Sequence, residues 1–456
     1  MEAPPLHSVV REVTLPDGLR LPDLLPLLTP TACWIRRSEG IVGLGVADGA
    51  TASGSQRFVE LARWWEERRA VVDEAPRPAA LEQIPGCGPT VFTSVTYSSD
   101  SAHASHLTLP EVILGDVAGR TWVTVTTPET DDAEEGRDGG GGGDVTTVLA
   151  RHGLVLGHDG TLAPAAEAGR AADDARSEFP ATRLRAGAHP TEHYLDAVAA
   201  GVEAIEERRL EKLVLGRDAV VEAEAPMPRG TILAGLARDY TDCWTYLAGD
   251  LLGTTPEMLV TVRGRDLAAR VLAGTVDGSL SADEARVQLL EDVKQRSEHE
   301  IAVQSLLAQL APVVELISAQ NPPAVLALPN VHHLSTDVTG RLSRTADGTL
   351  PPALTVAERA HPTAAICGTP TATAAELIAA LEQLDRGPFT GPVGWIDAHG
   401  NADVGIALRG GLLDDDDRSV RLFAGCGIVA GSDPESELAE TRAKLRPMLG
   451  VLGVED

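Results

Sequence analysis

A run of acidic residues followed by glycines interrupts the chain and limits how the rest can fold. Residues 131–144 are rich in Asp and Glu, and five consecutive glycines stand at 139–143. Such a segment cannot bury enough apolar surface to offset the entropy lost on ordering it. We expect a disordered surface loop there, with a linker as the alternative, so that the packed structure is built from the segments on either side.

Strand-like and helix-like patterns alternate on both sides of this loop. Clustered or alternating β-branched residues predict strands over 91–97 and 121–127, and residues 58–69 predict a helix. After the loop, apolar residues at helical spacing predict a helix over 191–207. The short apolar run 212–215 follows it as a buried strand.

Capping signals mark two further helices. Ser281, with Glu284 three residues later, is a capping box, and helical patterning resumes over 294–316. The last helix is expected to begin at Pro434 with Asp433 as its N-cap. Two glycines around residue 426 are too few for a Rossmann or Walker phosphate loop, which excludes those nucleotide-binding classes.

Composition narrows the class of protein. A net charge of −29 argues against nucleic-acid binding, which needs a basic face. The first 13 residues lack a signal-like apolar region and no run reaches the roughly 18 apolar residues of a membrane span, so we expect a cytoplasmic protein. The cysteines show no C-x-x-C spacing, which favours buried thiols over disulfides or zinc; they are Cys33, Cys87, Cys243, Cys367 and Cys426.

Lysine is rare in this chain. Of the 38 basic residues only Lys212, Lys294 and Lys444 are lysines, so 38 − 3 = 35 are arginines. Lysine, unlike arginine, can lose its proton and act as a base. Each lysine is therefore a candidate for chemistry, although biased codon usage explains the same scarcity equally well.

Carboxylates and lysines share helix faces at two places. Glu437, Glu440 and Lys444 lie at i, i+3 and i+7 of the last predicted helix, and Lys294 and Glu298 lie four residues apart on an earlier one. Carboxylate oxygens of this kind suit Mg²⁺. The commoner interpretation is a solvated salt bridge worth about 0.3–0.5 kcal/mol, and the spacing alone leaves both open.

Three further polar positions interrupt apolar segments. Glu257 stands at the start of an apolar run, where partial burial would raise its pKa and make it an acid, or where it is simply a polar strand start. His332 and His333 precede a predicted strand and are most simply structural hydrogen-bonding groups. Arg409 interrupts an apolar strand, and a buried arginine needs an anion, from the protein or from a ligand.

Taken in order, these segments resemble the chorismate-utilising enzymes and, within them, the isochorismate synthases. The resemblance spans nearly all of residues 188–449. The motifs that carry it are Lys212-Leu-Val-Leu-Gly-Arg217, Thr255-Pro-Glu-Met-Leu259, Leu272-Ala-Gly-Thr275, Lys294-Gln-Arg-Ser-Glu-His299, His333-Leu-Ser-Thr336, His361-Pro-Thr-Ala-Ala-Ile-Cys-Gly-Thr-Pro370, Gly391-Pro-Val-Gly-Trp395, Ile406-Ala-Leu-Arg409 and Gly425-Cys-Gly-Ile-Val-Ala-Gly-Ser-Asp-Pro434 with Glu437 and Glu440.

The resemblance implies a fold and a domain organisation. We expect an α+β protein with a single large chorismate-binding fold, in which layered antiparallel β-sheets are flanked by helices. Residues 1–185 would form the variable N-terminal half of that fold, and residues 188–450 the chorismate-binding catalytic region.

The resemblance also implies a reaction, the isomerisation of chorismate by water addition at C2 with loss of the C4 hydroxyl. Lys212 matches the general base that activates water, and Glu257 matches the general acid that protonates the departing hydroxyl. Lys212 would have to be neutral for this role, a state that burial or a nearby cation favours.

The expected cofactor is Mg²⁺, and the expected partner is the small-molecule substrate chorismate. Glu298, Glu437 and Glu440 match the metal ligands. The residues that match substrate-binding positions are Gly274, Thr275, His333, Ala365, Arg409, Gly425, Gly427 and Lys444. We expect no nucleic-acid or membrane partner, no glutaminase subunit, and a monomer.

Particular residues favour one branch of the family. Ala273 stands where aminodeoxychorismate synthases carry a lysine nucleophile, and His361 and Ala365 also match isochorismate synthases. We therefore expect an isochorismate synthase that feeds menaquinone biosynthesis. The alternatives are a salicylate synthase, a siderophore-pathway isochorismate synthase, or a non-catalytic relative. The loop 276–278 departs from the basic residues common in the family, which leaves open how tightly it covers the substrate.

Overall fold

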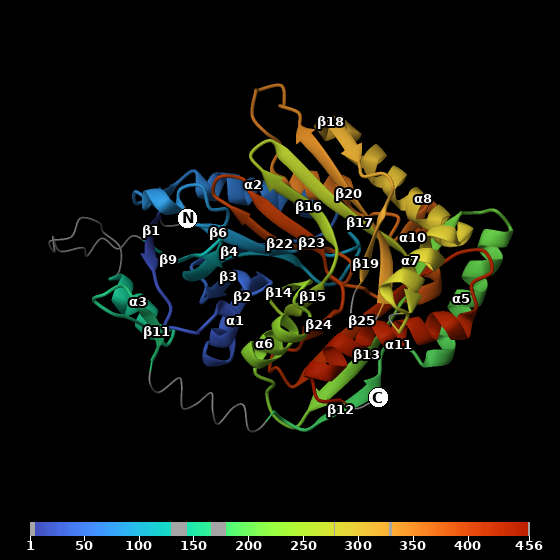
Figure 1. The fold of residues 1–456 in the computed structure, drawn as a ribbon, viewed down its shortest axis with the longest axis horizontal. Helices are drawn as coiled ribbons and strands as arrows, with labels where there is room; N and C mark the ends of the chain where they lie inside the picture. The colour runs from blue at the N-terminus through green and yellow to red at the C-terminus, as the bar shows by residue number, and fades with distance from the viewer. Residues whose placement is uncertain (1–4, 129–143, 166–178, 278, 328–330, 455–456) are drawn as a thin grey trace.

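The structure is a computed structural model that describes residues 5–128, 144–165, 179–277, 279–327 and 331–454 (Figure 1). Most of the loop expected over 131–144 lies outside these residues. Its last residue, Asp144, is described and is the N-cap of helix α3 (Val145–Arg151), where its carboxylate accepts hydrogen bonds from the backbone N–H groups of Thr146 and Thr147. Asp144 is therefore ordered, contrary to the prediction for this residue, because its carboxylate stabilises the N-terminus of the helix.

Two large sheets organise the described part of the chain. The larger has thirteen strands there: in spatial order β12 (Thr182–Ala186), β13 (Lys212–Ala223), β25 (Ser419–Ile428), β24 (Gly410–Leu413), β15 (Leu251–Thr255), β14 (Trp244–Ala248), β2 (Pro30–Arg36), β3 (Glu39–Leu44), β8 (Val112–Val117), β9 (Arg120–Pro128), β1 (Leu6–Val13) and β5 (Val72–Glu74), with β21 (Gly368–Thr369) beside β13. Neighbouring strands are antiparallel except for the parallel pair β1 and β5.

The second sheet has ten strands within the described ranges. In spatial order they are β18 (Val314–Ala319), β20 (Val331–Leu342), β17 (Asp266–Asp277), β16 (Met258–Arg263), β23 (Ala402–Ile406), β22 (Pro392–Asp397), β6 (Thr90–Ser94), β7 (Ser105–Leu109) and β4 (Asp48–Ala52), with β19 (Ala324–Ala327) beside β20. A small hairpin is formed by β10 (Leu154–Leu156) and β11 (Leu162–Pro164). Both large sheets combine strands from before and after the loop at 131–144.

Helices cover the outer faces of the two sheets (Figure 1). Within the described residues, the α-helices besides α3 are α1 (Leu21–Leu24), α2 (Arg57–Arg69), α5 (Thr191–Glu206), α6 (Arg229–Asp239), α7 (Ala282–Glu291), α8 (Val293–Leu310), α9 (Ala353–Ala360), α10 (Thr371–Glu382) and α11 (Pro434–Val451). Apolar residues of α1, α6 and α11 pack on the thirteen-stranded sheet, and those of α2, α8 and α9 pack on the ten-stranded sheet.

The inner faces of the sheets pack against each other. Trp34, Trp122 and Tyr246 of the larger sheet share one buried cluster with Phe92 and Trp395 of the smaller sheet. Burial of such aromatic side chains is a large source of apolar stabilisation. The layers are therefore helix, sheet, sheet and helix, which confirms the expected α+β class with layered antiparallel sheets.

The chain crosses from one sheet to the other at two adjacent places. Pro256 and Glu257 connect β15 of the larger sheet to β16 of the smaller, and the segment 407–409 connects β23 back to β24. The two crossings are bonded together: Ile406 N–H donates to the carbonyl of Glu257 at 3.0 Å, and Thr254 N–H donates to the carbonyl of Arg409 at 3.2 Å. Residues from both sheets therefore meet at this junction.

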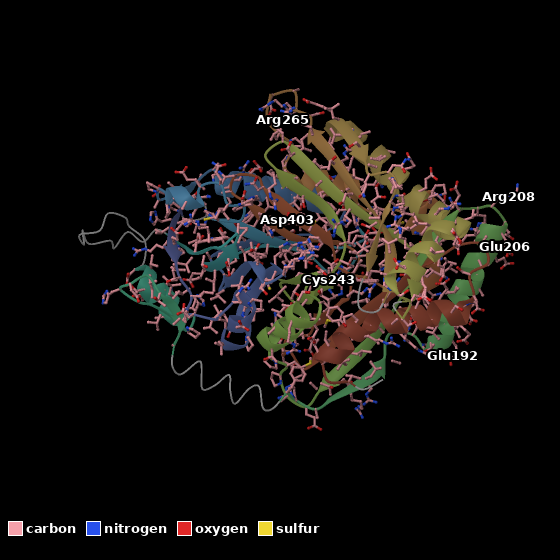
Figure 2. All side chains as sticks on the ribbon, in the orientation of Figure 1. Glu192, Glu206, Arg208, Cys243, Arg265 and Asp403 are labelled. Atoms are coloured by element: carbon pink, nitrogen blue, oxygen red, sulfur yellow. The ribbon has the colours of Figure 1, made fainter. Side chains whose placement is uncertain are left out.

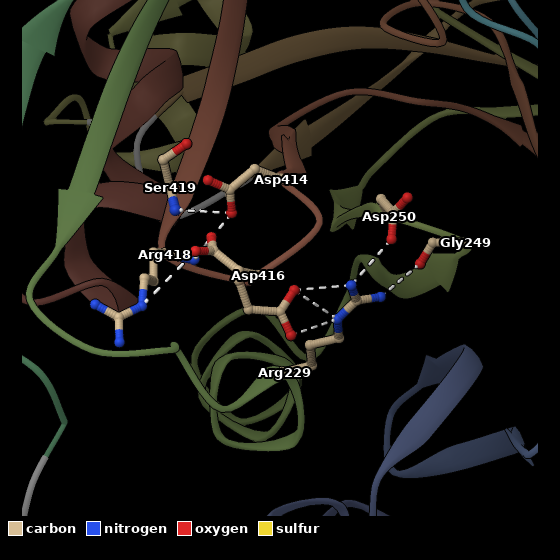
Figure 3. A network of polar contacts seen from close by, with 8 residues as sticks. Arg229, Gly249, Asp250, Asp414, Asp416, Arg418 and Ser419 are labelled. Carbon is tan, nitrogen blue, oxygen red and sulfur yellow. Dashed lines mark hydrogen bonds and ion pairs between the residues drawn. The ribbon is translucent and has the colours of Figure 1, made fainter.

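Arg229, the first residue of α6, joins two turns of the larger sheet (Figure 3). Its guanidinium donates to the carbonyl of Gly249 at 3.0 Å, to Asp250 at 2.9 Å and to Asp417 at 2.7 Å. The turn after β24 is closed by the carboxylate of Asp414, which accepts backbone hydrogen bonds. These contacts fix the β14–β15 and β24–β25 turns at one end of the strands that lead to the junction.

Several local predictions are confirmed. Helix α2 covers 57–69, strand β9 covers 120–128, α5 covers 191–206, and β13 begins at Lys212. Ser281 and Glu284 form the predicted capping box, and Asp433 caps α11. All five cysteines are buried and free, and Figure 2 shows Cys243 in the interior, whereas Glu192, Glu206 and Arg208 at the ends of the α5 segment are exposed.

Other local predictions are wrong. The helix predicted over 294–316 ends at Leu310, because Pro312 lacks a backbone donor and lies in a 3₁₀ turn before β18. The strand predicted over 91–97 ends at Ser94, since Thr96 N–H bonds to the Ser105 hydroxyl instead of a neighbouring strand. His332 and His333 lie inside β20 and do not precede it.

None of the described helices is long and apolar enough to cross a membrane.

Candidate active site

A cavity of about 1010 Å³, including its open mouth, lies at the junction of the two sheets. Of the residues singled out from the sequence, it is lined by Lys212, Glu257, Glu298, His333, Ala365, Arg409, Gly425, Gly427, Glu437, Glu440 and Lys444. These residues are spread over more than 230 positions of the chain and come from both sheets, from α8 and α11, and from the segments that connect such elements. Two others, Gly274 and Thr275, follow the lining residue Ala273 in β17.

Lys212 is held at the base of this cavity. It is the first residue of β13 and is only 1% exposed, and its Nζ lies 2.8 Å from Oε1 of Glu298 on α8. Gly427 on the neighbouring strand β25 leaves room for this pair. A Cβ at Gly427 would lie 2.9 Å from Oε1 of Glu298 and 3.1 Å from Cε of Lys212. A methyl group at this position would therefore displace the ends of the Glu298 and Lys212 side chains from their present contact.

Glu257 supplies a carboxyl group that is buried at the first sheet crossing. The residue is 5% exposed, and its backbone N–H donates to the Thr255 hydroxyl at 3.2 Å. Burial raises the pKa of Glu257 to about 8, against the opposing charges of Lys212, Lys444 and Arg409. The group is therefore mostly protonated at neutral pH, which is the state that an acid needs.

The three predicted metal-binding carboxylates face the same cavity. Ligand atoms of Glu437 and Glu440 lie within 4.8 Å of each other and of the Cys426 thiol. Glu298 is not a member of this group, and its carboxylate contacts Lys212 instead. Glu440 likewise contacts Lys444, at 2.6 Å.

This donor set fits a hard divalent cation. Mg²⁺ takes oxygen ligands and commonly keeps positions for water and substrate. Buried carboxylates need neighbouring positive charge, and at this site lysine ammonium groups supply it to Glu298 and Glu440. Glu298, Glu437 and Glu440 could therefore hold Mg²⁺ if the two lysines yield their contacts.

Cationic and neutral polar groups lie on the other walls of the cavity. Arg409, at the second sheet crossing, has a left-handed backbone with φ of 48°. The ammonium of Lys444 on α11 donates to the carbonyl of Gly425 at 2.8 Å. Burial lowers the pKa of His333 to about 3, so its ring is neutral. Arg409 and Lys444 are suited to bind an anion, and His333 to act as a hydrogen-bonding group.

The β17 edge of the site depends on one glycine. Gly274 has φ of 74°, in a bulge where the pairing of β17 with β20 shifts between Ala273 and Thr275. A Cβ at Gly274 would lie 2.9 Å from the carbonyl oxygen of Gln295. The backbone of Thr275 lies opposite His333, while its side chain falls outside the described part of the structure, as does that of Lys294.

Sequence reasoning missed two charged residues at this site. Arg386 lines the cavity, and it forms a buried ion pair with Glu382, the last residue of α10. A Glu and an Arg four residues apart are the usual pattern of an exposed helix surface. The pattern therefore carried no signal of burial, and only the packing of α10 against β13 reveals it.

Comparisons with known proteins identify the family and support the fold. Residues 28–453 match the family model described as chorismate binding enzyme. The isochorismate synthase DhbC of Bacillus subtilis is 35% identical over 278 residues, which are 58% of this chain and 68% of that protein. The isochorismate synthase MenF of Bacillus subtilis is 27% identical over 432 residues, 91% of this chain and 86% of that protein. The solved structure of the menaquinone-specific isochorismate synthase MenF from Escherichia coli, 20% identical, aligns with a TM-score of 0.71 over 99% of this chain and 95% of that one.

Proposed function

The chain belongs to the chorismate-binding enzyme family, and from that premise we propose that it is an isochorismate synthase, an Mg²⁺-dependent isomerase that converts chorismate to isochorismate. One observation carries the proposal: a lysine amine and a carboxyl group with a pKa of about 8 line the same cavity, Lys212 from one strand start and Glu257 from a sheet crossing. Opposed basic and acidic groups are what the exchange of a hydroxyl group around a ring requires.

The reaction balances with one water molecule consumed and one released. Lys212, released from its contact with Glu298 and in its neutral form, would take a proton from water as the water oxygen attacks C2 of chorismate, and the ring double bonds shift. Glu257 would give its proton to the C4 hydroxyl, which leaves as water. After both transfers, a proton returned from Lys212 to Glu257 through solvent restores the enzyme.

The remaining groups would bind and orient the substrate. Chorismate is a dianion, and Arg409 and Lys444 offer N–H donors to its carboxylates. Glu298, Glu437 and Glu440 would hold Mg²⁺, which when bound supplies a positive charge for the ring carboxylate. Local positive charge of this kind is needed because the chain as a whole carries a net charge of −29.

We assign the product to menaquinone biosynthesis. The support is that the isochorismate synthase MenF of Bacillus subtilis matches 91% of this chain. A role in siderophore synthesis is the alternative, since relatives named for that use also match part of the chain.

The test is turnover by the purified full chain with chorismate and Mg²⁺, analysed by chromatography and mass spectrometry. Isochorismate as the product supports the proposal. Formation of pyruvate, detected with a coupled lactate dehydrogenase, together with salicylate would replace it with a salicylate synthase. The Lys212→Ala variant is expected to lose turnover while it still binds chorismate in the presence of Mg²⁺, and equal turnover in wild type and variant would refute the role of Lys212.

A further inference from the structure

A buried ion pair lies beside the cavity, and the reaction above does not use it. Arg386 and Glu382 are each 3% exposed. The guanidinium donates from Nε to Oε2 of Glu382 at 2.9 Å and from Nη2 to Oε1 at 2.5 Å. Burying two charges is costly unless their remaining hydrogen-bonding groups are also satisfied. What this buried pair does for the protein therefore depends on the other hydrogen bonds that the two side chains make.

Those partners use every donor of the guanidinium. Nη1 of Arg386 donates to the carbonyl of Ile366 at 3.0 Å and to the hydroxyl of Thr390 at 3.3 Å, and Nη2 donates to the carbonyl of Val214 at 2.9 Å. With the two contacts to Glu382, all five N–H groups of the side chain are engaged. Oε1 of Glu382 also accepts from the backbone N–H of Gly216 at 2.5 Å.

The contacted segments are three separate walls of the cavity. Val214 lies two residues after Lys212 on β13, Ile366 follows Ala365, and Thr390 precedes β22. All three line the cavity. The guanidinium also lies 4.5 Å from the centroid of the Tyr97 ring, which restricts its movement.

We propose that Arg386, oriented by Glu382, is a positioning residue of the isomerisation, which holds the strand of Lys212, the segment of Ala365 and the segment of Thr390 at fixed separations around the substrate. The inference rests on the proposed function. A planar fork with five donors can bridge several acceptors at once, whereas a lysine at this position would keep the charge beside Glu382 but lose the bridging geometry. A shift of about 1 Å in a catalytic group can cost about 100-fold in rate.

The test is the Arg386→Lys variant, assayed in the full chain with chorismate and Mg²⁺. We expect kcat to fall about 100-fold, with the KM for chorismate and the Mg²⁺ concentration for half activity changed less than about threefold, because the groups that contact substrate and metal remain. The matched control is Arg68→Lys. Arg68 is also buried, at 5% exposed, and pairs with Asp48 between α2 and β4, outside the lining of the cavity.

The control separates positioning from stability. Both variants are expected to lower the melting temperature, but Arg68→Lys should keep kcat within about twofold of wild type. A kcat for Arg386→Lys close to that of wild type, or equal losses of kcat in both variants when both are folded, would overturn the inference. Absence of isochorismate with the wild-type chain would instead refute the proposed function.

A milder variant, Thr390→Val, keeps the inference testable if Arg386→Lys does not fold, and chemical rescue of folded Arg386→Ala is a second test. Thr390→Val removes one of the five acceptors, and we expect kcat to fall severalfold at unchanged KM. In Arg386→Ala, millimolar guanidinium is expected to restore part of the lost kcat, and an equal concentration of ammonium is not. Unchanged kcat in Thr390→Val, or equal effects of the two cations, would count against a bridging role.

Discussion

Replacement of Glu257 by glutamine separates the chemical role of this carboxyl group from its cost to stability. The amide keeps the shape of the protonated side chain but has no acidic proton to transfer. Loss of a general acid lowers the rate by about 10²–10⁴-fold, and we expect kcat of Glu257→Gln to fall within that range. Stability should change in the opposite direction, because folding of the wild type must keep a proton on a group that is ionised when unfolded.

The size of the stability effect follows from the raised pKa. Burial raises the pKa of Glu257 from 4.5 to about 8, partly offset by Lys212, Lys444 and Arg409. Between these two values the folded state binds more protons than the unfolded state, so stability falls as the pH rises through that window. The slope reaches about 1.4 kcal/mol for each pH unit and is smaller near pH 5 and pH 8, where one of the two states is only partly titrated, so the penalty grows by about 3–4 kcal/mol from pH 5 to pH 8. The glutamine variant does not carry this penalty.

Thermal unfolding of both proteins at pH 5 and pH 8 measures the difference. For a chain of 456 residues, about 3–4 kcal/mol corresponds to about 3–4 °C in melting temperature. The melting temperature of Glu257→Gln relative to wild type should therefore rise by about 3–4 °C between the two pH values. Glu60→Gln, at an exposed position of α2, is the control and should show no such rise. A constant difference between Glu257→Gln and wild type, or a variant with more than about a tenth of wild-type kcat, would refute the reasoning.

Two further predictions concern the base of the cavity and the metal. Gly427→Ala places a methyl group 2.9 Å from Oε1 of Glu298, so kcat should fall at least about tenfold because the ion pair of Lys212 and Glu298 is displaced. Gly450→Ala is the control, since its methyl group meets nothing within 4 Å, and it should leave kcat unchanged. Equal kcat in the two variants would exclude the steric argument. Chelation of the metal with EDTA should abolish turnover, and added Mg²⁺ should restore it. Glu440→Gln should raise the Mg²⁺ concentration for half activity at least about tenfold. Turnover that is insensitive to EDTA would contradict the proposed dependence on Mg²⁺.

Local signals in the sequence predict individual helices and strands but not the order of the strands within each sheet. The boundary between α5 and β13 was predicted because apolar spacing changes there from the helical period to a continuous run. In contrast, β13 pairs with β25, about 200 residues further along the chain. Strand pairing over such separations is decided by packing of both faces, and no local pattern specifies it. The error over 294–316 is different, since Pro312 is a local signal that ends the helix, and the strand β18 that follows pairs with β20.

At the candidate site, too, the spacing of charged residues in the sequence does not predict whether they are buried. Glu440 and Lys444 form an i, i+4 ion pair, as the salt-bridge interpretation expects, but both groups line the cavity and not an exposed helix face. Glu382 and Arg386 have the same spacing, but Arg386 lies beyond the end of α10 and both residues are buried. Spacing identifies which side chains can meet on a helix, whereas burial depends on what packs against it.

The charges that line the cavity link the binding of substrate to the pKa of Glu257. Three cations, Lys212, Lys444 and Arg409, each lower the pKa of Glu257, and burial outweighs them. A bound dianion would neutralise part of that positive charge, so the pKa of Glu257 should rise further in the complex. The alkaline limb of kcat, which reports the complex, should then lie at higher pH than that of kcat/KM, which reports the free enzyme near pH 8. Coincident limbs would mean that the substrate carboxylates do not neutralise the cations that face Glu257.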